Sequence, residues 1–84
     1  MENKAIKPGD FILSLAGRDR GKVMVVLTAA DGFFYCADGK ERRIEAPKKK
    51  KSKHILPLDV PQYNGKTSNR ELRNAIKALT DDVK

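Results

Sequence analysis

Three cations and two glycines share one short stretch of this sequence, Gly17-Arg18-Asp19-Arg20-Gly21-Lys22. Glycine adopts positive φ without steric cost, so the stretch can turn the chain sharply. Such a turn would hold two guanidinium groups and one ammonium group on the outside of the protein. Several fixed cations suit the binding of a polyanion better than the binding of a small-molecule substrate.

The segments on both sides of this loop are expected to be strands. Residues 11–15 and 22–28 are rich in β-branched and aromatic residues, which favour strands. In the first segment one face, that of Phe11, Leu13 and Leu15, should point into a core. The second segment is apolar on both faces, as in a central strand. Joining the two strands requires at least one position at positive φ in the loop.

Turn signals indicate further short strands along the chain. Asp31-Gly32 and Asp38-Gly39 have the composition of tight hairpin turns. We expect strands at residues 33–37 and 41–45, and a closing strand at residues 54–58. Short antiparallel strands at this spacing predict a mostly β fold, a small SH3-like barrel.

The hydrophobic period changes after Asp59. Residues 60–66 contain proline and Asn-Gly breakers, which predict a loop. Ser68 and Glu71 then have the spacing of a capping box. The apolar residues that follow at helical spacing are Leu72, Ala75, Ile76 and Leu79. We therefore expect a barrel in residues 1–60 and, in residues 61–84, a loop and a helix that ends near Thr80 and packs on the barrel.

The net charge of +7 is concentrated in one segment, residues 40–54, which carries eight cations and two glutamates. The cations are Lys40, Arg42, Arg43, Lys48, Lys49, Lys50, Lys51 and Lys53. A segregated basic block inside a folded chain is the electrostatic footprint of a protein that binds nucleic acid or an anionic surface. The alternative is a solvated lysine run that serves only solubility. Cations at residues 70, 73 and 77 of the predicted helix could extend the basic surface.

Several other classes of protein fit the composition poorly. The chain has one cysteine and one histidine, too few for a structural zinc site or an internal disulfide, so Cys36 is expected to face the core and no metal or cofactor is expected. No apolar run approaches the length of a membrane span, and no secretory signal precedes the first strand, which favours the cytoplasm. Gly17-x-x-x-Gly21-Lys22 is one residue short of P-loop spacing. No nucleophile accompanies His54, so we expect no enzyme.

The glycine-cation loop between two strands resembles the KOW motif of ribosomal proteins and transcription elongation factors. Together with the segment Lys53-His54-Ile55-Leu56-Pro57 and the C-terminal helix, it resembles the archaeal and eukaryal large-subunit ribosomal protein family fourteen-e over nearly the whole chain. The resemblance implies an SH3-like barrel that binds ribosomal RNA. It also implies that the loop cations, the lysines at 48–51 and 53, and His54 lie near RNA. The basic run here is nearly pure lysine, where relatives mix in arginine.

Charge and resemblance together predict a non-catalytic RNA-binding protein of translation, either a ribosomal subunit or a ribosome-associated protein. Its partners would be ribosomal RNA and neighbouring ribosomal proteins, with no membrane and no small-molecule substrate. The predicted RNA-binding residues are Arg18, Arg20, Lys22, Lys40, Arg42, Arg43, Lys48, Lys49, Lys50, Lys51, Lys53 and His54. The alternative is a KOW module that binds another protein, which would need an exposed apolar groove. Among the aromatic residues, Tyr63 is the candidate for stacking on a base.

Overall fold

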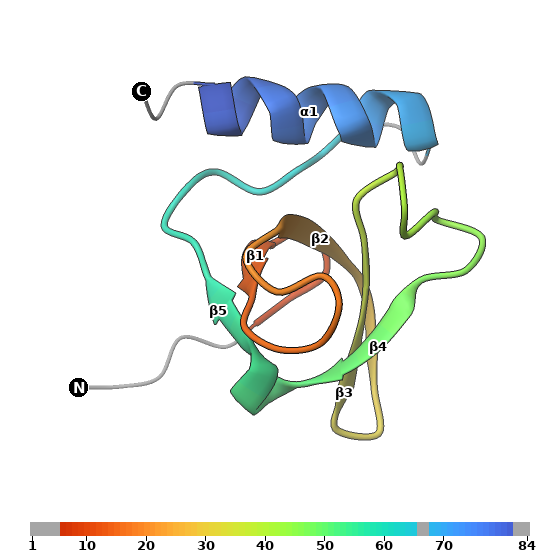
Figure 1. Ribbon diagram of the computed structural model, residues 1–84, viewed down its shortest axis with the longest axis vertical. Helices are drawn as coiled ribbons and strands as arrows, with labels where there is room; N and C mark the ends of the chain where they lie inside the picture. Colours follow the sequence, from red (N-terminus) through yellow and green to blue (C-terminus); the bar gives the residue numbers. More distant parts are fainter. Residues whose placement is uncertain (1–5, 66–67, 82–84) are drawn as a thin grey trace.

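Five antiparallel strands form one sheet in the order β4-β3-β2-β1-β5, and a helix follows them (Figure 1). The computed structural model describes residues 6–65 and 68–81. Its elements are β1 (Phe11–Ser14), β2 (Val23–Ala30), β3 (Phe33–Ala37), β4 (Lys48–Lys51), the 3-10 turn η1 (Ser52–His54), β5 (Ile55–Pro57) and α1 (Asn69–Asp81). The predicted fold class is confirmed: the chain is mostly β, a small barrel-like sheet with one C-terminal helix.

Two features curl the sheet. The middle strand, β2, contains an extra residue, and a short turn in the chain connects the two outer strands, β4 and β5. The register between β2 and β3 shifts between Val26 and Thr28, which inserts a bulge and bends the strand. η1 connects β4 directly to β5, so the two outer strands of the sheet are consecutive in sequence. The backbone N–H of Leu15 donates to the carbonyl of His54 at 2.9 Å, which holds η1 against the end of β1.

Two apolar clusters lie on opposite faces of the sheet. The cluster on one face contains Ile12, Met24, Val26, Cys36 and Ile55. The cluster between the sheet and α1 contains Phe11, Val25, Ala37 and Leu72. β1 and β2 therefore contribute to both clusters, whereas only one apolar face was predicted for β1. Leu15, predicted to face the core with Phe11, is 41% exposed. Burial raises the pKa of the Cys36 thiol to about 11, and its predicted place in the core is confirmed.

α1 begins and packs as the sequence pattern predicts. The backbone N–H of Glu71 donates to the Ser68 hydroxyl at 3.1 Å, which is one half of the predicted capping box. Leu72 is completely buried in the cluster beneath the helix, and Ala75, Ile76 and Leu79 pack against the same cluster. The helix therefore lies along one side of the barrel (Figure 1), and the packing of its apolar residues holds it there.

The prediction of a strand at residues 41–45 is wrong. The carboxylate of Asp38 accepts hydrogen bonds from the backbone N–H groups of Lys40 and Arg42, both at 2.9 Å, and this turn chemistry competes with strand pairing. The N–H of Ile44 donates to the side chain of Asn69 at 2.8 Å instead of to a neighbouring strand. The fourth strand is the lysine run 48–51, which pairs with β3.

Positive φ occurs where the turns require it. Gly17 and Gly21 have φ of 85° and 86°, which confirms the conformation predicted for the loop between β1 and β2. Asp31 and Gly32, at 53° and 80°, provide the two positive φ values of a tight hairpin turn between β2 and β3. Gly39 combines a φ of 79° with close packing, since a Cβ built there would lie 2.3 Å from the backbone oxygen of Asn69 in α1.

Gly39→Ala should therefore destabilise the fold more than Gly21→Ala. Both glycines have the same left-handed conformation, but a Cβ at Gly21 would meet no atom within 4 Å. We expect Gly21→Ala to lower the free energy of unfolding by about 1–2 kcal/mol through backbone strain alone. Gly39→Ala should cost roughly 1–3 kcal/mol more, because α1 must move away from the barrel. Urea unfolding of the two variants measures the difference, and equal losses would contradict the close packing of α1 against Gly39.

Candidate nucleic-acid interface

The loop between β1 and β2 is closed by backbone hydrogen bonds at its base. The N–H of Ser14 donates to the carbonyl of Lys22 at 2.9 Å, and the N–H of Gly21 donates to the carbonyl of Ser14 at 2.8 Å. The N–H of Arg20 donates across the turn to the carbonyl of Gly17 at 3.2 Å. The exposed side chains of Arg18 and Arg20 are therefore carried by a loop whose backbone is fixed.

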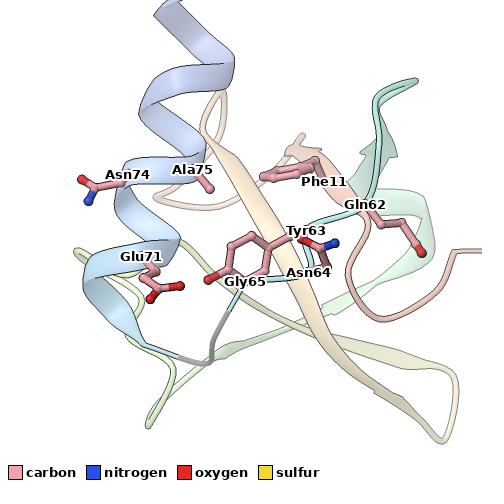
Figure 2. A pocket seen from close by; sticks show the side chains of 8 residues that line it. All are labelled: Phe11, Gln62, Tyr63, Asn64, Gly65, Glu71, Asn74 and Ala75. Atoms are coloured by element: carbon pink, nitrogen blue, oxygen red, sulfur yellow. The ribbon is translucent and has the colours of Figure 1, made fainter.

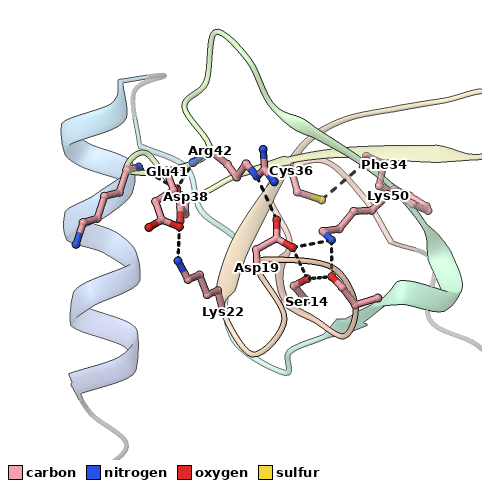
Figure 3. A network of polar contacts seen from close by, with 11 residues as sticks. Ser14, Asp19, Lys22, Phe34, Cys36, Asp38, Glu41, Arg42 and Lys50 are labelled. Atoms are coloured by element: carbon pink, nitrogen blue, oxygen red, sulfur yellow. Dashed lines mark hydrogen bonds and ion pairs between the residues drawn. The ribbon is translucent and has the colours of Figure 1, made fainter.

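Asp19, between these two arginines, is only 3% exposed and points into the protein (Figure 3). Its Oδ1 accepts hydrogen bonds from the Ser14 hydroxyl at 3.1 Å and forms an ion pair with the Lys50 ammonium at 2.9 Å. Its Oδ2 accepts from the Arg42 Nε at 3.3 Å. One carboxylate thus connects the loop to β1, to β4 and to the segment after β3.

The charges around Asp19 favour its ionised form. Burial by itself raises the pKa of the carboxyl, but the hydrogen bond and positive charge of Lys50 and the hydroxyl of Ser14 outweigh this effect. The pKa is consequently held below the ordinary value for aspartate. Lys50 also donates to the carbonyl oxygen of Ala16 at 3.1 Å, so its ammonium contacts the loop at two points.

The position of Lys50 does not fit the prediction that this residue contacts RNA. Its residue exposure is 5%, and its ammonium is engaged by the loop. The physical reason is strand geometry, because successive side chains of a strand point to opposite faces. In β4, Lys50 pairs with Phe34, which packs against the core cluster of Ile12 and Met24. The other face carries the exposed side chains of Lys49 and Lys51.

A hollow of about 310 Å³ that is open to solvent lies between the loop, the ends of β3 and β4, and η1. We call it the β4 cavity; its lining residues are Ala16, Gly17, Phe33, Lys48, Lys49, Lys50, Lys51 and His54. The structure therefore brings together four of the predicted RNA-binding residues that remain exposed or half-buried, three lysines and His54, together with one aromatic residue. The Lys49 ammonium lies 4.5 Å from the centroid of that ring, at Phe33.

The remaining predicted cations line the other side of the loop or lie further away. Arg18, Lys22 and Arg42 line a second hollow of about 460 Å³, together with Asp19 and Glu41. Lys22 forms an ion pair with Glu41. The hydrogen bond between them raises the pKa of Lys22 and lowers the pKa of Glu41. Arg20 and Lys53 are exposed, and Arg43 lies 3.9 Å from the carboxylate of Glu45.

Cations of the helix extend the basic surface on this second side. A groove of about 610 Å³ between α1 and the barrel is lined by Lys22 and Lys40 from the barrel and by Arg73 and Lys77 from the helix. Arg73 also donates to the carbonyl of Gly39 at 3.1 Å, which fixes part of its side chain. The helix thus adds two cations to those that the loop and the segment after β3 supply.

Tyr63, predicted as the aromatic residue for base stacking, packs against the barrel instead. Its ring lies edge-on to Phe11, with 6.3 Å between the centroids, and it joins the apolar cluster beneath α1. Figure 2 shows the side chain between the 61–65 segment and the helix, in a hollow that Glu71 and Ala75 also line. Three aromatic residues of β3 pair with the lysines of β4, and among them Phe33 has the Lys49 ammonium over its ring and also lines the β4 cavity.

Within residues 6–65 and 68–81, no three His, Cys, Asp or Glu side chains converge in a way that could hold a metal ion. No helix in this part of the chain is long and apolar enough to cross a lipid bilayer. The sequence matches no model of a known protein family and no curated protein.

Asp19→Asn should destabilise the protein strongly, because it leaves the buried ammonium of Lys50 without a counter-charge. Removing one partner of a buried ion pair costs about 3–5 kcal/mol. Glu41→Gln is the matched control, since it removes a carboxylate from the exposed pair with Lys22 and should change stability little. Urea unfolding at neutral pH measures both. Equal stabilities of the two variants would show that the buried pair does not hold the loop.

The same pair predicts a pH dependence. The pKa of Asp19 is lowered in the folded protein, so its contribution is fully present above the pKa of the unfolded chain, about 3.9. It is lost as the pH falls from there through the folded-state value. The stability difference between the parent and Asp19→Asn should therefore shrink below about pH 4, which unfolding curves across this range would measure.

Proposed function

We propose that this protein binds RNA without catalysing a reaction, and that the RNA is ribosomal, bound as part of the ribosome or in association with it in the cytoplasm. The observation that carries the proposal is the arrangement of cations around the fixed loop. The β4 cavity lies on one side of the loop, and the two basic hollows that share Lys22 lie on the other. A polyanion that crosses the loop would meet cations on both sides.

The two kinds of cation would act differently on this polyanion. Lysine ammonium groups such as those of Lys49 and Lys51 act as point charges on phosphates and supply affinity through counterion release. Guanidinium groups such as those of Arg18 and Arg20 can form two parallel hydrogen bonds and so favour particular geometries. Because the loop backbone is closed at its base, the RNA would have to order only the side chains of these arginines and not the loop itself.

The second candidate function is protein binding, and one observation favours it. Leu15 and Leu56 are 41% and 47% exposed. Leu56 pairs with Leu13 on β1, so the register places all three leucines on one face of β1 and β5. This face provides part of the apolar surface that a protein-binding module needs. The cations are more numerous and more clearly arranged, so we favour RNA.

The proposal predicts salt-dependent binding that the outward lysines of β4 support. With roughly four to seven phosphate contacts, log K should fall linearly with log salt concentration, at somewhat under one unit per contact. The double variant Lys49→Ala/Lys51→Ala should reduce the slope by about two and weaken binding to different RNAs equally. Fluorescence anisotropy with a structured ribosomal RNA fragment at several salt concentrations measures both quantities.

Lys7→Ala is the matched control for this experiment. Lys7 is exposed, but it precedes β1, whereas the cationic loop follows β1 at the other end. We expect the control to bind RNA almost like the parent, and both variants to unfold at the parent's temperature. Absence of binding at low salt would refute RNA binding. In that case, loss of a protein partner upon Leu56→Ser would support the second candidate.

A further inference from the structure

Phe33 differs from the other phenylalanines because it belongs to neither apolar cluster. Phe11 is buried beneath α1, and Phe34 packs against the other cluster. Phe33 is half-buried, and its partner across the β3–β4 ladder is Lys51. The alternation of the strand places Phe33 on the face opposite to Phe34, the same face as Lys49 and Lys51. Phe33 is one of the residues that line the β4 cavity, and its ring lies beneath the ammonium of Lys49, which also lines it.

The ring face is covered by a side chain that can move away. The Lys49 ammonium lies 4.5 Å from the ring centroid, and the rest of this lysine is exposed. A cation over an aromatic ring at an exposed site is held weakly. A planar base stacked on the ring makes a more extensive contact, and the released ammonium is then free to contact a phosphate.

The other walls of the cavity suit a nucleotide. Gly17 contributes backbone without a side chain, and the closed loop holds this backbone in place. Lys51 and His54 place a positive charge and a hydrogen-bonding ring at the cavity. The volume of about 310 Å³ is at the lower end for small-ligand sites and suits one planar group.

We propose that the β4 cavity takes one unpaired nucleobase of the RNA, which stacks on Phe33 while adjacent phosphates contact Lys49, Lys51 and His54. This inference rests on the proposed function and specifies the class of RNA that the protein prefers. A base within a perfect duplex is stacked on its neighbours and does not reach the cavity. An RNA with an unpaired nucleotide therefore binds more tightly than one without. Since every base has a π face, the preference is for an unpaired base of any kind.

The test compares two RNA duplexes of equal length with blunt ends. One has a single bulged adenosine, and the other has an abasic nucleotide at the same position, which keeps the phosphates but removes the base. We expect the parent protein to bind the adenosine bulge about tenfold more tightly than the abasic bulge. Phe33→Leu should bind both duplexes as the parent binds the abasic one. Tyr35→Leu is the matched control: Tyr35 lies on the same face of β3 but does not line the cavity, so this variant keeps the preference.

The remaining outcomes distinguish a failure of the base-stacking site from a failure of RNA binding itself. If the parent binds both duplexes equally, RNA binding stands and the stacking site is overturned. If the parent binds neither, the proposed function itself is wrong. A tenfold preference that survives in Phe33→Leu places the base elsewhere and overturns the inference.

A second variant keeps the test decisive if Phe33→Leu does not fold. The sequence contains no tryptophan, so Phe33→Trp introduces a fluorophore at the cavity that nothing else in the protein obscures. Its emission should be quenched by the adenosine bulge and much less by the abasic bulge. Equal quenching by the two duplexes would overturn the inference.

Discussion

The buried ion pair between Asp19 and Lys50 is the interaction on which the arrangement of the cationic surface depends. Two charges removed from water are costly unless their mutual attraction and additional hydrogen bonds offset the loss. Here the carboxylate also accepts from Ser14 and Arg42, and the ammonium also donates to Ala16. Loop, β1, β4 and the segment after β3 are therefore held in one arrangement, which a hydrophobic contact, lacking direction, would define less closely.

The pair also explains how a loop with a net positive charge can be rigid. Arg18 and Arg20 repel each other, and a solvated loop would let them separate. Asp19 lies between them in sequence but on the other side of the backbone, so its charge stabilises the interior and leaves the arginines outside. The lysines of β4 are likewise divided between the two faces of the strand. Lys50 faces the interior and forms the ion pair, whereas Lys49 and Lys51 face the solvent.

Features with local causes could be predicted from the sequence, whereas those that depend on distant partners could not. The loop glycines, the Asp31-Gly32 turn and the Ser68 cap follow from conformational preferences of a few adjacent residues. The strand expected at residues 41–45 fails for a reason of each kind. The Asp38 carboxylate takes two backbone N–H groups locally, a turn that was missed, and Asn69, far along the chain, takes the N–H of Ile44.

The candidate site shows the same limit. Most of its cations could be read from composition, but the burial of Lys50 depends on a carboxylate from another strand connection. Two features of the sequence were compatible with this buried pair. One is the acidic residue between two arginines, Asp19, and the other is the lysine run 48–51, which could form a strand with alternating faces. The nearby aromatic ring was also missed, since the sequence alone does not show which of Phe33 and Phe34 packs against the core.

The closed backbone of the loop has a kinetic consequence for the proposed complex. A binding surface that must first fold loses productive encounters, whereas one that is already formed captures its partner as fast as diffusion and charge bring the two together. The hydrogen bonds at the base of the loop and the internal ion pair hold the loop in its binding conformation in the absence of a partner. Good and poor RNA targets would then be separated mainly by how long they stay, because they would arrive at similar rates.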